Sequence, residues 1–213
     1  MTSIKISPDR PSTSALCSYA GMASVAQRAY NHDFVPGTGG PYPAGARVIA
    51  CSTTLGSGRM CYAAASRLLR KWKMHEGSAT TGISALYDGS TPLPGSAVVT
   101  WARMAPLVWV LNPCRVVRPA AGLAMPPGGG QCVRRSTAVA YATTEGHLIA
   151  GVEHMRVTFS RDGTVAFQVH SVSHGAGFVG RALFPLLAPA QRRFFHEQCR
   201  CMREQLCDAD QVR

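Results

Sequence analysis

The sequence has few acidic residues and no long hydrophobic run. Eleven Asp and Glu residues stand against 22 Lys and Arg, which gives a formal net charge of +11. The longest apolar stretch, residues 105–111, has the length of a strand and contains Pro106, whereas a membrane helix needs about 20 apolar residues. We therefore expect no transmembrane segment, and we expect a basic surface that attracts polyanions at low salt.

Signatures of specific nucleic-acid recognition are also missing. The basic residues are spread over two predicted helices and several loops, without a run of five like charges or interleaved aromatic residues. We expect no specific nucleic-acid partner, and a basic scaffold or RNA-associated protein is kept as an alternative function. A continuous basic strip would favour that alternative, and it would join Arg67, Arg70 and Lys71 to Arg192, Arg193 and Arg200.

Motifs for metal binding and for nucleophilic catalysis do not occur. The eight cysteines are irregularly spaced and form no paired CxxC knuckle. Near the C-terminus Cys199 and Cys201 would lie about 200° apart on a helix, so they cannot face one ion, and only His196 and Cys199 share a face. There is no P-loop and no G-x-S-x-G elbow. We expect no metal, no cofactor and a fold that needs no disulfide.

The N-terminal region shows no secretory signal, because the first 30 residues lack a continuous apolar core. They are rich in Ser and Thr and contain three basic residues and one acidic residue. We expect an intracellular, cytoplasmic protein, with mitochondrial import as the alternative. Residues 1–45 are interpreted as an N-terminal arm with a short Ala-rich helix, followed by a segment rich in Gly and Pro, and residues 46–207 as one α+β domain.

Hydrophobic periodicity predicts two helices in this domain. Residues 58–73 place Cys61, Ala65, Leu68 and Trp72 on one face, and we expect Trp72 to be buried against a sheet. A second apolar stripe runs through the C-terminal region. There Pro185 and Pro189 predict a short helix, a kink and then a main helix from about residue 189. Residues with β propensity predict strands at 47–55, 97–104, 107–111 continuing to 114–117, 137–144, 152–159 and 164–172.

Several short motifs follow one another between residues 46 and 206. They are LGSG (55–58), WKM (72–74), NPCRVV (112–117), AYAT with GH (140–147), Gly-x-Glu (151–153) and SVS (171–173). In order and spacing they resemble the uncharacterised DUF1990 family of actinobacteria and plants, for which no activity is established. The resemblance implies a helix-grip fold of the START or Bet v 1 kind, in which a curved antiparallel sheet of about six strands packs on a long C-terminal helix.

The chain departs from that family pattern in three places. Val152-Glu153 stands where the family usually has two adjacent glutamates, Met155 stands where it favours an aromatic residue, and the insert at 119–130 is longer. The first departure argues against a mechanism that uses two carboxylates. The fold is associated with pockets for hydrophobic ligands, which makes ligand binding the leading hypothesis by analogy.

Candidate site residues lie on and around the predicted strand 152–159. Its odd positions form an apolar face on which Glu153 is the only carboxylate, so this group needs a hydrogen-bond donor or a raised pKa. His147, in the preceding loop, is close enough in sequence to pair with Glu153. Equally consistent are a Glu153 that reaches solvent at the strand end and a His147 bonded to backbone in a turn.

Two functional readings follow from these residues. In the first, a small apolar or amphipathic ligand binds without catalysis between the sheet and the C-terminal helix, and Tyr141, Thr143, His147 and Glu153 orient it. The wall would then consist of Met155, Val157, Phe159, Val165, Phe167 and Val169. In the second, a cyclase- or hydrolase-type enzyme uses His147 and Glu153 as acid and base.

A further candidate is the start of the first predicted helix. Backbone N–H groups at a helix N-terminus bind anions, and here Ser57 and Gly58 are followed by Arg59. We interpret these three residues as a candidate anion site. An ordinary helix N-cap at Ser57 explains the same pattern.

Overall fold

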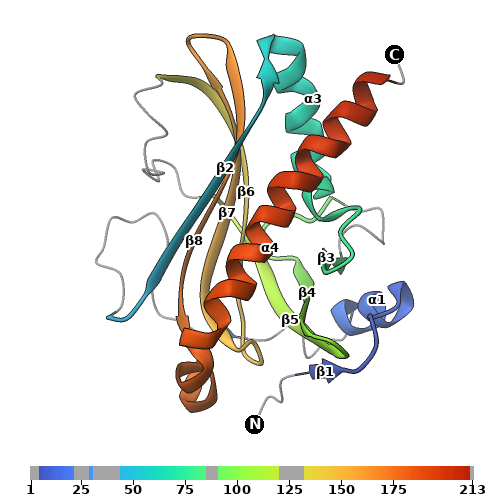
Figure 1. Cartoon of the computed structure of the whole chain (residues 1–213), viewed down its shortest axis with the longest axis vertical. Coiled ribbons are helices and arrows are strands. Elements are labelled where there is room, and N and C mark those ends of the chain that lie inside the picture. The colour runs from blue at the N-terminus through green and yellow to red at the C-terminus, as the bar shows by residue number, and fades with distance from the viewer. Residues whose placement is uncertain (1–4, 22–28, 31–43, 85–90, 120–131, 212–213) are drawn as a thin grey trace.

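A curved antiparallel sheet wraps around a long C-terminal helix in the computed structural model of the chain (Figure 1). The structure describes residues 5–21, 29–30, 44–84, 91–119 and 132–211. The helix-grip architecture implied by the family resemblance is therefore confirmed. The predicted insert at 119–130 lies almost wholly outside the described residues, as does most of the segment 22–43.

The sheet contains eight strands in the described part of the chain, and all of them pair antiparallel with their neighbours. Along the main path the order is β2 (Arg47–Ser57), β8 (Thr164–Gly175), β7 (Ile149–Ser160), β6 (Val133–Thr143), β5 (Val108–Val117), β4 (Ala97–Ala105) and β3 (Thr81–Ile83), and β1 (Lys5–Ser7) also pairs with β5. The predicted strands are all present. The two short stretches around Asn112-Pro113 form one strand, because Pro113 is accommodated within β5.

The central hairpin explains why β7 and β8 pair over their whole length. Each strand alternates residues of its two faces, and Gly163 at the turn adopts a φ of 88°, which glycine reaches without steric cost. The Asp162 side chain accepts a hydrogen bond of 2.9 Å from the backbone N–H of Thr164. The register that follows sets Glu153 opposite Ser171 on β8 and opposite Tyr141 on β6.

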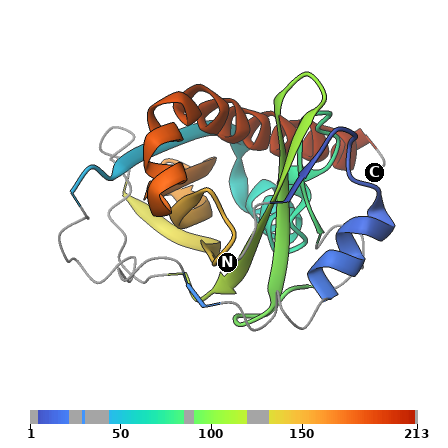
Figure 2. The ribbon, with the colours of Figure 1, turned by 90° about the horizontal axis from the view of Figure 1, so that it is seen from below.

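The C-terminal helix differs from its prediction. It is continuous as α4 (Gly177–Gln211) and contains both prolines, so the expected separation into a short and a main helix is wrong. Pro185 and Pro189 are both exposed, which leaves the backbone groups they cannot bond on the solvent side of the helix. The expected kink is present as a bend within the continuous helix, whose first turns run at an angle to the remainder (Figure 2).

The helix α3 (Gly58–Arg70) ends slightly earlier than predicted, and the short helix η1 (Lys73–His75) follows. Trp72 stops the helix by adopting a left-handed backbone with φ 57°. Its side chain is only 1% exposed, which confirms the expected burial of Trp72. It lies against the Tyr141 ring, with 5.9 Å between the ring centroids.

The main core fills one half of the space between the sheet and its helical cover. Here α3 and the C-terminal half of α4 pack on β6, β7, β8 and β2. The N-terminal segment builds a second, smaller core on the opposite face of β4 and β5, where the helix α1 (Thr13–Gly21) contributes Leu16 and Tyr19. Trp101 and Trp109 meet them there, so part of the predicted arm belongs to the packed fold.

Candidate functional site

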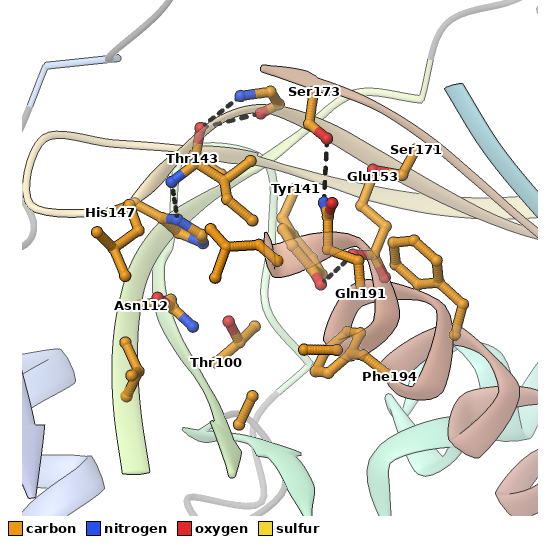
Figure 3. Close-up of a pocket in the computed structure, with 18 of the residues that line it drawn as sticks. Thr100, Asn112, Tyr141, Thr143, His147, Glu153, Ser171, Ser173, Gln191 and Phe194 are labelled. Atoms are coloured by element: carbon orange, nitrogen blue, oxygen red, sulfur yellow. Dashed lines mark hydrogen bonds between the residues drawn. The ribbon is translucent and has the colours of Figure 1, made fainter. Parts of the chain in front are cut away.

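A pocket lies between the sheet and the N-terminal half of α4 (Figure 3). About 730 Å³ of space, including its open mouth, is left unfilled by protein. Apolar side chains come from the helix, with Leu187, Ala190, Phe194 and Phe195, and also from the strands and the loop before β7, with Ala102, Met104, Val110, Leu148, Ile149 and Val152. Polar side chains come mainly from the strands: Thr100, Asn112, Tyr141, Thr143, Glu153, Ser171 and Ser173.

The register of the sheet explains why the pocket forms at this end. One row across β6, β7 and β8 consists of Tyr141, Glu153 and Ser171, which all line the pocket. The next row toward the hairpin turn is apolar and large, and its members Val139, Met155 and Val169 pack in the core. The concave face of the sheet therefore changes from filled to open between these two rows.

Glu153 is held inside the pocket wall and is only 7% exposed. Its carboxylate accepts a hydrogen bond of 2.6 Å from the Tyr141 hydroxyl and one of 2.5 Å from the Gln198 side-chain amide. Burial raises the pKa of Glu153 to about 7 and outweighs these two hydrogen bonds, which lower it. Near neutral pH the carboxyl is therefore present in both protonation states.

Tyr141 works as a donor to this carboxylate. Burial, together with the negative charge of Glu153, raises the pKa of the Tyr141 hydroxyl well above its usual value, so the proton stays on the phenol. The ring is fixed between Trp72 and the pocket. Tyr141 thus fixes the orientation of the Glu153 carboxyl.

His147 lines the same pocket but makes other contacts. Its Nδ1 accepts a hydrogen bond of 2.9 Å from the backbone N–H of Ile149, and burial lowers the pKa of His147, which keeps the ring neutral. Among the described residues no hydrogen bond joins His147 to Glu153, whose partners are Tyr141 and Gln198. The structure therefore brings the two residues to one pocket without forming the pair considered from the sequence.

Thr143 occupies the pocket wall beside His147, and its hydroxyl is engaged by the neighbouring strand. The oxygen accepts a hydrogen bond of 2.8 Å from the Gly151 N–H and donates one of 3.1 Å to the Gly151 carbonyl (Figure 3). These two hydrogen bonds fix β6 to β7 at the pocket end of the sheet. It leaves Thr143 as a wall residue whose polar group is already satisfied.

The apolar residues proposed for the wall lie elsewhere. They do not line the pocket, and they pack with α3 and the C-terminal half of α4 in the main core: Met155, Val157, Phe159, Val165, Phe167 and Val169. Their side chains share the inward face with Glu153, as the alternation predicts. They differ from it in being covered by a second helix.

The sequence analysis missed several residues that line the pocket or hold its wall. Gln198 lies between Phe195 and Met202 on the apolar face of α4 and bonds Glu153. A polar residue within an apolar stripe was the feature of the sequence that could have revealed it. Gln191 donates a hydrogen bond of 3.0 Å to Ser173 and accepts one of 3.2 Å from Arg47. The alternation of Ser171 and Ser173 was visible in the sequence, but nothing local indicated what they face.

The start of α3 shows how the three candidate anion-binding residues are placed. Ser57 has an extended backbone, makes no side-chain cap hydrogen bond and is exposed, as is Arg59. The Gly58 N–H donates a hydrogen bond of 2.9 Å to the Gly163 carbonyl of the hairpin turn. One backbone donor of the candidate anion site is therefore used within the fold.

The basic residues of the proposed strip are in part paired. Arg200 forms ion pairs of 2.8 Å with Glu197 and 2.5 Å with Glu204, and Arg193 donates to the backbone carbonyl of Arg103.

Across the described ranges no cluster of three or more His, Cys, Asp or Glu side chains is arranged to hold a metal ion. Nor does any helix within them combine the length and apolar character that crossing a membrane requires.

The sequence model of the family described as "Domain of unknown function (DUF1990)" matches residues 24–201. The chain belongs to this family. The match begins inside the segment that we interpreted as an N-terminal arm and covers the whole sheet apart from β1. No curated protein matches the sequence.

Solved structures with a similar arrangement share little sequence with the chain. A hypothetical protein of Helicobacter pylori is 9% identical, with 73% of this chain and 85% of that chain covered and a TM-score of 0.47. A norcoclaurine synthase of Thalictrum is 9% identical, with 78% and 96% covered and a TM-score of 0.45. Major latex-like protein 151 of Panax ginseng is 12% identical, with 75% and 96% covered and a TM-score of 0.39.

Proposed function

We propose that this DUF1990 protein binds a small amphipathic ligand in the pocket between α4 and the polar rows of the sheet. The observation that carries the proposal is the contrast, among the described residues, between the two halves of one concave face: the half under the N-terminal part of α4 is open, and the other half is packed.

The arrangement of the wall supports a ligand with one polar end. Phe194 and Leu187 present an apolar surface on α4, while Glu153, Tyr141 and Ser171 form a polar strip on the opposite strands. A ligand would bury its apolar part against the helix and place its polar group toward Glu153. A carboxyl with a pKa of about 7 accepts a hydrogen bond when ionised and also donates one when protonated.

The experiment compares two substitutions of the same kind on one helix. Ala190 lines the pocket, and Ala182 is exposed on α4 outside it. Binding of an anilinonaphthalene dye is measured by fluorescence for A190Q and A182Q, and native mass spectrometry of the purified proteins records any retained small molecule. We expect A190Q to weaken binding about tenfold or more, which corresponds to about 1.4 kcal/mol, and A182Q to leave it unchanged. Equal dye affinity in the two variants would refute the pocket as the binding site.

A catalytic function is the second candidate, and the Glu153 carboxyl is the observation that favours it. A group with a pKa of about 7 exchanges a proton near neutral pH, and Tyr141 holds it in one orientation. The acid–base role would then belong to Glu153 alone, since the neutral His147 is bonded to backbone. Catalysis would be established if the wild type converts a retained ligand at a rate whose pH dependence changes near pH 7, and if E153Q does not convert it. An unchanged ligand after incubation would argue for binding only.

A further inference from the structure

Two cysteines and a histidine meet where α4 packs on the edge strand β2. Cys51 lies on β2, the edge strand, and its Sγ is 3.3 Å from the Sγ of Cys199 on α4. The Nδ1 of His196, also on α4, is 3.5 Å from the Cys51 Sγ. A disulfide bond is about 2.05 Å long, so the two sulfurs are already separated by only about 1.3 Å more than a bond would require.

The three side chains differ in their access to solvent. His196 is exposed, Cys51 is half-buried and Cys199 is only 6% exposed. Burial raises the pKa of the Cys199 thiol, and its proximity to Cys51 raises it further. Cys51 is therefore the thiol that a small polar reagent reaches first, and it lies beside the exposed imidazole of His196. Cys199 is the buried thiol that is close enough to react with Cys51 afterwards.

We propose that Cys51, Cys199 and His196 form a thiol–disulfide site that reacts with hydroperoxides. The Cys51 sulfur attacks one peroxide oxygen after His196 has taken its proton, so that an S–O bond forms and the O–O bond breaks. The leaving oxygen takes up a proton and departs as water or an alcohol, and Cys51 becomes a sulfenic acid. The Cys199 sulfur then attacks the Cys51 sulfur, an S–S bond forms, the S–O bond breaks, and the departing hydroxide combines with the Cys199 proton to give water.

The two reaction steps together convert two thiols and one hydroperoxide into one disulfide, one water and one alcohol. If the oxidant is hydrogen peroxide, a second water is released in place of the alcohol. A low-molecular-weight thiol would reduce the disulfide and restore both cysteines. The new bond would tie the edge of the sheet to α4. It would do so at the residue next to Gln198, which holds Glu153 in the pocket wall. The oxidised protein would thus have the helix fixed over the sheet at the inner end of the pocket.

Tryptic peptide mapping tests the site directly, because cleavage isolates each cysteine. The peptide 48–59 contains Cys51 alone, and the peptide 194–200 contains Cys199 alone. The reduced protein is treated with one equivalent of hydrogen peroxide in the presence of a chelator, alkylated and digested without reductant. We expect the two peptides to appear as one cross-linked species that has lost the mass of two hydrogens. The intact wild-type protein suffices for this measurement, so the result does not depend on the folding of any variant.

Variants assign the individual roles. In C199S the sulfenic acid should remain on peptide 48–59 and be trapped by a cyclic β-diketone, and in H196Q the cross-link should form about tenfold more slowly or worse. The control C207S removes an exposed cysteine from the same helix and should leave the yield and rate unchanged. Absence of the cross-linked peptides 48–59 and 194–200 in the wild type would overturn the proposal. So would trapping of a sulfenic acid on Cys199 rather than on Cys51 in the wild-type protein. An unchanged rate in H196Q would overturn the role of His196.

Discussion

The two halves of the concave sheet face are built by the same strands and covered by the same helix, yet one is solid and the other is hollow. In the filled half, α3 inserts beside α4 and large apolar residues such as Val157 and Phe167 meet it. In the open half the corresponding strand positions are Glu153 and Ser171, and within the described part of the chain no second helix covers them. The difference shows that a helix-grip sheet does not enclose a cavity by its curvature alone. The cavity arises where the rows become polar and the additional helix ends.

The open half requires a hydrogen-bonding order that the filled half does not. A buried polar group without a partner costs about 1–3 kcal/mol, so hydrogen bonds among the polar wall residues stabilise this half. Gln198 and Tyr141 share the Glu153 carboxylate, and Gln191 joins Ser173 to Arg47. These bonds hold the wall in place without filling the space in front of it. They give the pocket a fixed shape before any ligand arrives.

The largest effect is expected from F167A in the filled half. Phe167 is fully buried, and removal of a large core side chain leaves a cavity that costs about 3–5 kcal/mol of unfolding free energy. Urea denaturation followed by intrinsic fluorescence measures the loss. Dye affinity should stay within about twofold of wild type, because Phe167 does not line the pocket. A tenfold change in the dye affinity of folded F167A would mean that the ligand site extends into the filled half.

The position of Phe167 in the structure also shows which features the sequence predicted. Alternation on β7 and β8 correctly assigned Glu153, Val157 and Phe167 to the inward face, because side-chain direction is a local property of a strand. Whether an inward side chain meets another helix or an open space is decided by α3 and α4, which lie far away in sequence. Strand patterns therefore predicted the strands and the direction of Glu153, and the family resemblance implied the fold, but neither separated pocket from core.

Other differences have equally specific causes. Pro185 and Pro189 were expected to divide the C-terminal region into a short helix and a main helix joined by a kink, but their exposure allows one continuous helix with a bend. The pairing of His147 with Glu153 was considered from their short separation in sequence. The loop instead turns the His147 ring back to the Ile149 N–H, which loop length alone does not determine. Gln198 was hidden because a single polar residue in an apolar stripe reveals its importance only when its partner is known.

The second prediction concerns Glu153 and pH. The pKa of this carboxyl is raised from 4.5 to about 7 in the fold, so the protonated form contributes stability that is complete below about pH 4.5 and is lost as the pH rises through about 7. At about 1.4 kcal/mol per pH unit the loss amounts to about 3 kcal/mol. E153Q removes the titrating group. We therefore expect its stability relative to wild type to increase by up to about 3 kcal/mol between pH 4.5 and pH 8.

The measurement is the difference in unfolding free energy between wild type and E153Q at several pH values, which cancels the titration of all other groups. The same series with dye present separates a role in binding from a role in folding, since the binding proposal expects the affinity of E153Q to change about tenfold. A stability difference that is constant from pH 4.5 to pH 8 would mean that Glu153 titrates normally. A destabilised variant with unchanged dye affinity would make Glu153 a purely structural tie.

The smallest effect on stability is expected from L187A at the pocket wall, and it is the most direct test of the comparison. Leu187 is buried at 8% exposure but already borders open space, so its truncation enlarges the pocket and creates no new enclosed cavity. We expect a loss of about 1.5–2 kcal/mol in unfolding free energy, because only the transfer term for a buried Leu side chain applies and no cavity term is added. The matched variant L69A makes the same change on α3, where Leu69 is fully buried in the main core, and should cost about 2–5 kcal/mol. Dye affinity should change in L187A and not in L69A. Equal stability losses at the two positions would show that the space beneath α4 is packed as tightly in solution as the core beneath α3.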